Sequence, residues 1–186
     1  NLELKPYGVS RLTTDRIVRP PVRNDLGYDL GLDVKYGVTK SLVADFTYNT
    51  DFAQVEVDEA QVNLTRFNLQ LPEKREFFLE GQGIYTFGGV TGGGNGDAPT
   101  IFFSRRIGLD GARAVPIGLG GRLAGRIGQY NIGALNISTD RISSPEVAAT
   151  NFSVLRVRRD VMQRSSIGAL LTHRSDSSVA AGGNQV

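Results

Sequence analysis

The stretch that decides the fold is residues 27–38, which read GYDLGLDVKYGV. Every second residue from Tyr28 to Val38 is aliphatic or tyrosine, and every residue between them is glycine, aspartate or lysine. Successive side chains of a β-strand point to opposite faces of the sheet. The stretch therefore predicts a strand with one apolar face and one polar or small face.

The same alternation recurs along the chain. Residues 42–49 repeat it after the polar segment 39–41, so the two runs predict a hairpin. The pattern at residues 130–138 slips near Leu135, which predicts a β-bulge. We expect loops at residues 10–25, 88–99 and 139–150. We expect residues 1–186 to form a single β-barrel segment. Further strands are expected near residues 2–9, 101–107, 117–126, 130–138, 152–159 and 166–173.

Composition excludes several classes of site. The chain has no cysteine and one histidine, so it can form neither a disulfide framework nor a thiolate or histidine metal cluster. A net charge of +2 gives no reason to expect a nucleic-acid partner. We expect no metal and no cofactor. No run approaches the roughly 18 apolar residues of a membrane-spanning helix. Because the chain begins at Asn1 without a methionine, we expect it to be part of a longer protein.

Tyrosine spacing favours a membrane barrel over a soluble sandwich. Tyr28 and Tyr36 share the apolar face, about 26 Å apart along a strand that rises about 3.3 Å per residue. A tilt of about 40° leaves roughly 20 Å along the membrane normal, close to the apolar band of about 25 Å that aromatic girdles bound. Runs of about 9 to 12 residues also exceed the typical soluble strand of about 5 to 6. The opposite face would line a polar lumen and carries Asp29, Asp33, Lys35, Asp45, Arg122 and Arg126.

These features predict an all-β fold, an antiparallel up-and-down transmembrane β-barrel segment. About 8 to 9 strands of a larger, incomplete barrel are expected. The expected partner is the lipid bilayer, the expected location is the bacterial outer membrane, and Tyr28, Tyr36 and Tyr48 are expected in its girdle. Short turns near Thr39, Ile127 and Asp160 should lie on one side of the membrane. That condition predicts an odd number of extra crossings within residues 51–100, with 53–57 or 77–85 as candidates.

Four segments carry a family resemblance: residues 51–64 (DFAQVEVDEAQVNL), 71–81 (LPEKREFFLEG), 104–108 (SRRIG) and 121–125 (GRLAG). In this order they resemble a bacterial family, the domain of unknown function numbered 5916. Leu71 and Glu76 depart from the phenylalanine and proline expected there. The resemblance implies the first part of a larger β-barrel, often preceded by a carbohydrate-binding module similar to family nine. Through that module, such proteins are labelled hydrolases or carbohydrate-binding. No catalytic residue carries over.

The carboxylate-rich region 51–80 admits three interpretations. A glycosidase site needs two acids about 5 to 10 Å apart, and a calcium site needs several oxygen ligands. We favour the third, in which ion pairs fix a loop against the lumen wall and residues 77–79 anchor it. The candidate binding residues are Glu73, Lys74, Arg75, Glu76, Glu80, Arg105 and Arg106.

Three functions stay open from the sequence. The first is an outer-membrane barrel with a transport or surface-anchoring role and no catalysis of its own. The second is part of a carbohydrate-binding or glycan-processing protein, whose enzymatic activity would be of the glycoside hydrolase type. The third is a soluble β-sandwich binding module, which predicts that Tyr28 and Tyr36 are buried.

Overall fold

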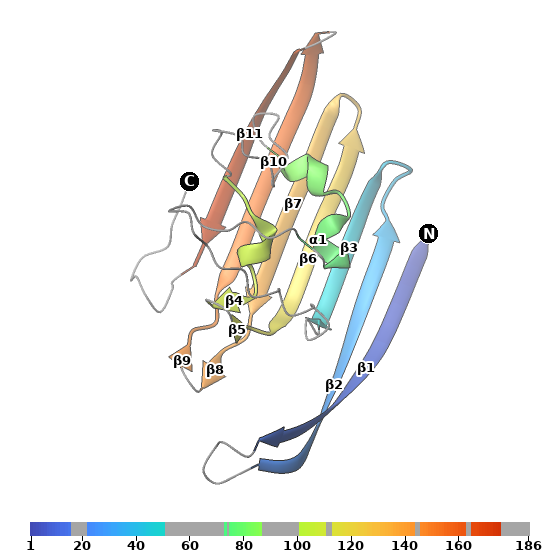
Figure 1. Ribbon diagram of the computed structural model, residues 1–186. Coiled ribbons are helices and arrows are strands. Elements are labelled where there is room, and N and C mark those ends of the chain that lie inside the picture. Colours follow the sequence, from blue (N-terminus) through green and yellow to red (C-terminus); the bar gives the residue numbers. More distant parts are fainter. Residues whose placement is uncertain are drawn as a thin grey trace.

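The long strands form one open antiparallel sheet. A computed structural model describes residues 1–15, 22–50, 73, 75–86, 101–110, 113–143, 146–162 and 165–175. Within them, seven strands pair in the order β1-β2-β3-β6-β7-β10-β11, and each follows its neighbour up and down (Figure 1). The expected all-β, antiparallel, up-and-down architecture is therefore confirmed. The strands are β1 (Leu2–Asp15), β2 (Val22–Gly37), β3 (Leu42–Thr50), β6 (Ile117–Ile127), β7 (Tyr130–Thr139), β10 (Asn151–Met162) and β11 (Ser165–Arg174).

One face of this sheet carries the described part of the segment between β3 and β6 (Figure 1). Its described residues, 73, 75–86 and 101–108, are called the insert here. It contains the helix α1 (Glu76–Leu79) and the 3₁₀ turns η1 (Gln82–Tyr85) and η2 (Ser104–Arg106). Two small two-stranded ribbons complete the described structure: β4 (Leu109–Asp110) with β5 (Arg113–Ala114), and β8 (Ile142–Ser143) with β9 (Glu146–Val147).

The hydrophobic core lies between the insert and the sheet. Phe78, Tyr85 and Ile107 of the insert pack against apolar side chains of β6, β7 and β10. We call the sheet face under the insert the inner face and the opposite one the outer face. The sheet side of the core is made of Ile117, Leu135, Ile137 and Val154.

The core explains why the bulge expected near Leu135 is wrong. β7 pairs without a register shift with β10 along 130–138, and with β6 from Tyr130 to Ser138. Leu135 and Ile137 are apolar because they face the insert, so the apolar residues of β7 change face although its backbone stays regular. The register shift lies on β6, between Ile117 and Leu119.

The short connections share one end of the sheet. The links 37–42 and 127–130 lie there, and β10 and β11 meet at the same end through Met162 and Ser165 (Figure 1). We call this the short-turn end. The ribbon β8–β9 lies at the opposite end.

This arrangement needs no extra crossing, because the strand expected at 101–107 does not exist. Ser104–Arg106 is a 3₁₀ turn whose apolar neighbour Ile107 is buried in the core. The candidate crossing 77–85 is wrong as well, since these residues form α1 and η1. The other candidate, 53–57, lies outside the described residues.

Loop boundaries also differ from expectation. The loop expected at residues 10–25 is wrong over much of its length, because β1 continues to Asp15 and β2 begins at Val22. The loop expected at 139–150 contains the ribbon β8–β9. The glycine-rich loop 88–99 lies outside the described residues. Among the residues that are described, no helix has the length and apolarity to span a bilayer.

Candidate functional site

A row of alternating charges crosses the inner face of the sheet. The register places Glu3 of β1 opposite Lys35 of β2, Lys35 opposite Asp45 of β3, and Asp45 opposite Arg122 of β6. Opposite charges on directly opposed residues stabilise strand pairing. The row therefore places two acids and two bases side by side under the insert.

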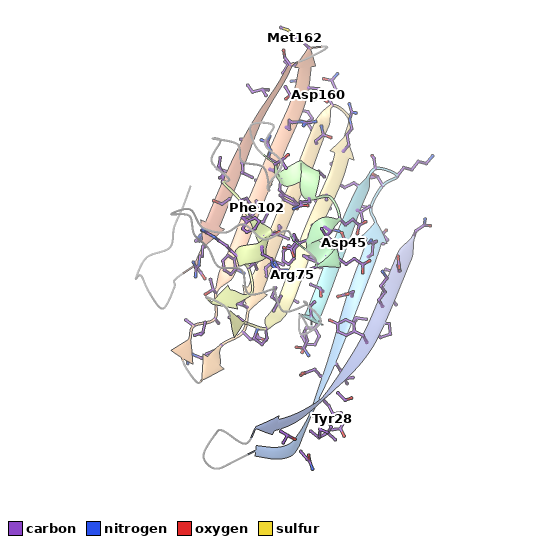
Figure 2. The ribbon with its side chains drawn as sticks, viewed as in Figure 1. Tyr28, Asp45, Arg75, Phe102, Asp160 and Met162 are labelled. Carbon is purple, nitrogen blue, oxygen red and sulfur yellow. The ribbon has the colours of Figure 1, made fainter. Side chains whose placement is uncertain are left out.

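Arg122 joins this row to the insert and pairs with Asp45, which is labelled in Figure 2. Its Nη2 lies 2.5 Å from Asp45 Oδ2, and its Nε donates to the same oxygen at 3.0 Å. Nη1 donates to the backbone carbonyls of Phe77, at 2.5 Å, and of Glu80. The Arg122 side chain is only 3% exposed and that of Asp45 8%. Hydrogen bonds help to offset the loss of water from a buried ion pair, and Arg122 makes them to Asp45 and to two backbone carbonyls.

Glu80 completes the network from the insert side. Its Oε2 accepts from Lys35 Nζ at 2.5 Å and from Arg122 Nη2 at 3.1 Å. The hydrogen bond from Lys35 is the largest influence on Glu80, and together with the charges of Lys35 and Arg122 it holds the pKa of Glu80 below its ordinary value. The carboxylate of Glu80 is thus ionised at neutral pH. We call Lys35, Asp45, Glu80 and Arg122 the Arg122 cluster.

A second cluster lies wholly inside the insert. Glu73 has a fully buried side chain, and its two oxygens accept from Arg75 Nε and Nη2, both at 2.7 Å. The Ser104 hydroxyl donates to Glu73 Oε2 at 2.7 Å, and Arg105 Nη1 lies 4.0 Å from Oε1. Arg75 also donates to the carbonyls of Ser104 and Ile107. This Glu73 cluster therefore ties the two halves of the insert together (Figure 2, near the labelled Arg75).

The pKa of Glu73 reflects two opposing effects. Burial, the larger single influence, raises it, because a charged carboxylate loses water. The hydrogen bonds and charge of Arg75, with the hydroxyl of Ser104, outweigh burial, and the pKa of Glu73 ends below its ordinary value. Glu73 therefore remains ionised in a dry environment.

The 3₁₀ turn η1 docks where β7 has a glycine. Tyr85 donates its hydroxyl hydrogen to the carbonyl of Ala134 at 3.1 Å. A Cβ atom at Gly133 would lie 2.7 Å from Ile84 Cγ2 and 3.0 Å from the Tyr85 ring, so only glycine permits this approach. Burial raises the pKa of Tyr85 to about 12.

The structure separates the binding residues that the sequence predicted. Glu73, Arg75 and Arg105 come together in one buried cluster, and Glu80 belongs to the other. Glu76 is exposed and lies 3.5 Å from Lys5 Nζ. The remaining two are Arg106, which is exposed on the insert, and Lys74, which lies outside the described residues.

The anchor expected at residues 77–79 is partly right. Phe78 is buried in the core and Phe77 packs against it, with their rings 5.2 Å apart. Leu79 is 45% exposed and contributes no anchor. Arg75 and Arg122 lie over the rings of Phe78 and Phe77, with their Cζ atoms 4.2 and 5.2 Å from the ring centroids.

Asp45, Arg122 and Lys35 were expected in the lumen wall but not among the binding residues. A signal for them was present, because each sits at an inward position of its strand and opposite charges recur on neighbouring strands. Pairing β3 directly with β6 is what aligns them, and β3 and β6 are separated by the long insert. Sequence alternation alone could not supply that pairing.

The three tyrosines expected in a girdle lie on the outer face. Tyr28 and Tyr36 are 72% and 49% exposed on β2. Tyr48 of β3 is 61% exposed and lies opposite Leu32, midway between them along β2.

A groove beside the Arg122 cluster is the open part of this region. Lys5, Asp33, Glu76 and Phe77 line it together with members of the cluster. Among the described residues, no group of three or more acidic or histidine side chains is placed to hold a metal ion. Within each cluster, the charged groups are instead paired with one another. This pairing suits both clusters to holding the insert in place.

Comparison with known proteins gives one match. A search of curated proteins and a search of solved structures found none. The model of a family described as a domain of unknown function, DUF5916, matches residues 1–116. This match spans β1 to β3 and the insert, up to the residue before β6. The chain therefore belongs to the DUF5916 family.

Proposed function

We propose that this chain forms part of the wall of a bacterial outer-membrane β-barrel, with the insert folded into the barrel's interior. Its role is transport or surface anchoring, and the segment is not itself catalytic. The observation that carries the proposal is the contrast between the two faces of the sheet. Charged and polar side chains are buried on one face while large apolar side chains are exposed on the other.

The outer face is apolar across its whole width. Leu4 on the first strand, Leu30 on the second, Phe46 on the third and Leu171 on the last are 57%, 75%, 55% and 58% exposed. Soluble monomers rarely expose a continuous apolar patch larger than a few hundred Å². A lipid-facing barrel wall requires this distribution, apolar outside and polar inside.

The outer face also lacks charge where a membrane would lie. Among the outward-facing residues from Leu2 to Leu12, from Leu26 to Tyr36 and on the other long strands of the described structure, Arg159 is the one arginine, lysine, aspartate or glutamate. Its guanidinium lies over the ring of Tyr130, with Cζ 5.3 Å from the centroid, near the short-turn end. Long cationic side chains at the edge of an apolar band reach the polar interface in this way.

The position of Tyr28 and Tyr36 weighs against a soluble sandwich. That alternative requires both rings to be buried beneath a second sheet, and in the described structure both are exposed. The distribution of connections also favours a membrane barrel. Such barrels carry short turns at one end and long loops at the other, and in the described structure the short connections share one end while the ribbon β8–β9 lies at the opposite one.

Single spin labels at two neighbouring positions of β2, one in each of two variants, test the proposal in the full-length protein reconstituted in lipid vesicles. Cysteine replaces Leu30 in one variant and its neighbour Asp29, on the opposite face, in the matched control. A nitroxide at position 30 should be relaxed strongly by oxygen and weakly by a water-soluble nickel chelate. The control should show a lower ratio of oxygen to nickel accessibility. Nickel accessibility at position 30 equal to that at 29 would refute a lipid-facing wall.

Extraction behaviour gives a second test. The full-length protein should leave the membrane fraction only with detergent. Its unheated form should also migrate faster on a denaturing gel than its boiled form. Recovery in the soluble fraction without detergent contradicts the proposal.

A further inference from the structure

The exposed apolar side chains of the outer face form a band. This band runs diagonally across the strands and not perpendicular to them. A reference row is provided by inner-face residues that the register places directly opposite one another, strand by strand. The row runs through Glu3, Lys35, Asp45, Arg122, Leu135, Val154 and Thr172, from β1 to β11. Positions of outer-face residues can be counted from this row toward either end of the sheet.

The edge of the band nearest the short turns climbs across the sheet. On β2 that edge is Tyr36, one residue beyond Lys35. On β7 it is Tyr130, five residues beyond Leu135 (135 − 130). The edge therefore shifts by four residues over the three strand-to-strand steps from β2 to β7, about 1.3 residues per strand.

The other edge climbs by a similar amount. On β2 we take it at the interfacial tyrosine, Tyr28, seven residues from Lys35 (35 − 28), although Leu26 continues the apolar face beyond it and is 49% exposed. On β10 it is Ser153, one residue from Val154, and its neighbour across the ladder on β11 is His173. Six residues over four steps give about 1.5 residues per strand. On β7 and β10 the outer face is polar from this edge onward, and Asn136 donates to Ser153 Oγ at 2.8 Å and to Asn151 Oδ1 at 2.9 Å.

A slope of this size has a geometric meaning. With a rise of about 3.3 Å per residue and a strand spacing of about 4.8 Å, a shift of 1.3 to 1.5 residues per strand corresponds to a tilt of about 42–46°. Strands of closed barrels tilt by about 35–45° from the barrel axis. A band that is horizontal in a membrane must run diagonally across strands tilted in this way.

From this geometry, and resting on the proposed function, we propose that the two edges mark where the sheet crosses the bilayer interfaces. Tyr36, Tyr130 and Arg159 lie at the interface on the short-turn side. Tyr28, Asn136, Ser153 and His173 lie at the other interface, where their polar groups hydrogen-bond the lipid headgroup layer. Phe46 lies close to the middle of the hydrocarbon, although Phe46 and Ser153 occupy the same register row, linked through Gly121 and Asn136.

This row makes the inference measurable. Three strand steps of about 4.8 Å on strands tilted by about 42° separate Phe46 and Ser153 by about 10 Å in membrane depth. Strands parallel to the membrane normal would place the two residues at equal depth. Tyr28 and Ser153 lie six residues apart in register and should be at equal depth in the tilted sheet.

The experiment places single spin labels at Phe46→Cys, Ser153→Cys and Tyr28→Cys in the full-length protein in lipid vesicles. Depth is read from the ratio of oxygen to nickel-chelate accessibility, calibrated with lipids labelled along their chains. The label at 46 should be about 10 Å deeper than the label at 153, and the labels at 28 and 153 should agree. Equal depths at 46 and 153, both within the hydrocarbon, overturn the diagonal boundary but leave the membrane wall intact. High nickel accessibility at all three positions means that the membrane wall itself is wrong.

Discussion

Arg122 is the residue on which the position of the insert depends most directly, and Arg122→Ala tests this. The change removes the hydrogen-bonded ion-pair partner of Asp45 at a site where the side chain is 8% exposed, and leaves it only Lys35, whose Nζ lies 4.0 Å away. It also removes the donors to the carbonyls of Phe77 and Glu80. Removing one partner of a buried ion pair costs about 3–5 kcal/mol, because the other charge remains in a poorly hydrated site. We therefore expect the free energy of unfolding to fall by about 3–5 kcal/mol.

The assay is urea unfolding of the full-length protein in detergent, followed by loss of the compact form on unheated gels. With a urea dependence of about 1–3 kcal/mol per molar, the midpoint should fall by about 1–5 M. Arg126→Ala is the matched control. Arg126 lies on the same strand but is exposed, and its side chain donates to the carbonyl of Gly128. A midpoint for Arg122→Ala no lower than that of the control would falsify the anchoring role.

A double variant keeps the test informative if Arg122→Ala does not fold. Asp45→Leu combined with Arg122→Met removes both charges and leaves neither one unpaired. Replacing a buried ion pair by apolar residues of similar volume is often neutral or stabilising. The double variant should therefore unfold at a higher urea concentration than Arg122→Ala. An equal or larger loss would show that the pairing of the two charges is not what matters.

Three further predictions follow from the insert. Gly133→Ala should lower the free energy of unfolding by about 1–3 kcal/mol, because the new methyl group meets Ile84 and the Tyr85 ring; Gly27→Ala, with open space around it, is the control, and equal effects would contradict the docking. The lowered pKa of Glu73 means that its ionised form stabilises the fold above the ordinary value of 4.5 and that this stabilisation disappears as the pH falls below it. Glu73→Gln should flatten this acid limb in stability measured from pH 7 to pH 3, and an unchanged limb argues against the assignment. Burial raises the pKa of Tyr85 to about 12, so this phenol should stay protonated at pH 11 in the folded protein. The absorbance spectrum of the original protein minus that of Tyr85→Phe should therefore show little phenolate at pH 11 before unfolding and a full phenolate signal after it.

The sheet could be predicted from the sequence because alternate residues of a strand face opposite sides, so their polarity indicates the environment of each face separately. Residues 27–38 have a uniformly apolar outer face and a small or charged inner face, so both the strand and its orientation could be inferred. On β7 the inner face is also apolar, since Leu135 and Ile137 contact the insert. A strand with two apolar faces has no simple alternation, so the sequence of β7 predicts a bulge where the backbone is regular.

The insert was the least predictable part for a related reason. Residues 101–107 resemble a strand in composition, yet Ile107 is apolar because it fills the core and Arg105 is buried beside Glu73. These positions are determined by contacts with residues far away in the chain. Short elements such as α1 and η2 carry too few residues for periodicity to distinguish a turn of helix from a strand.

The pairing of β3 with β6 has a consequence for the order in which the protein folds. The strands on either side of this pair form two meanders, β1-β2-β3 and β6-β7-β10-β11, each built from neighbours along the chain. Joining them brings together Asp45 and Arg122, which are 77 residues apart in sequence. Closing a long loop carries an entropic cost that no local contact offsets, and non-local pairing slows folding. The two meanders should therefore assemble early and separately, and the seam between β3 and β6 should close last, when the insert is in position to receive Arg122.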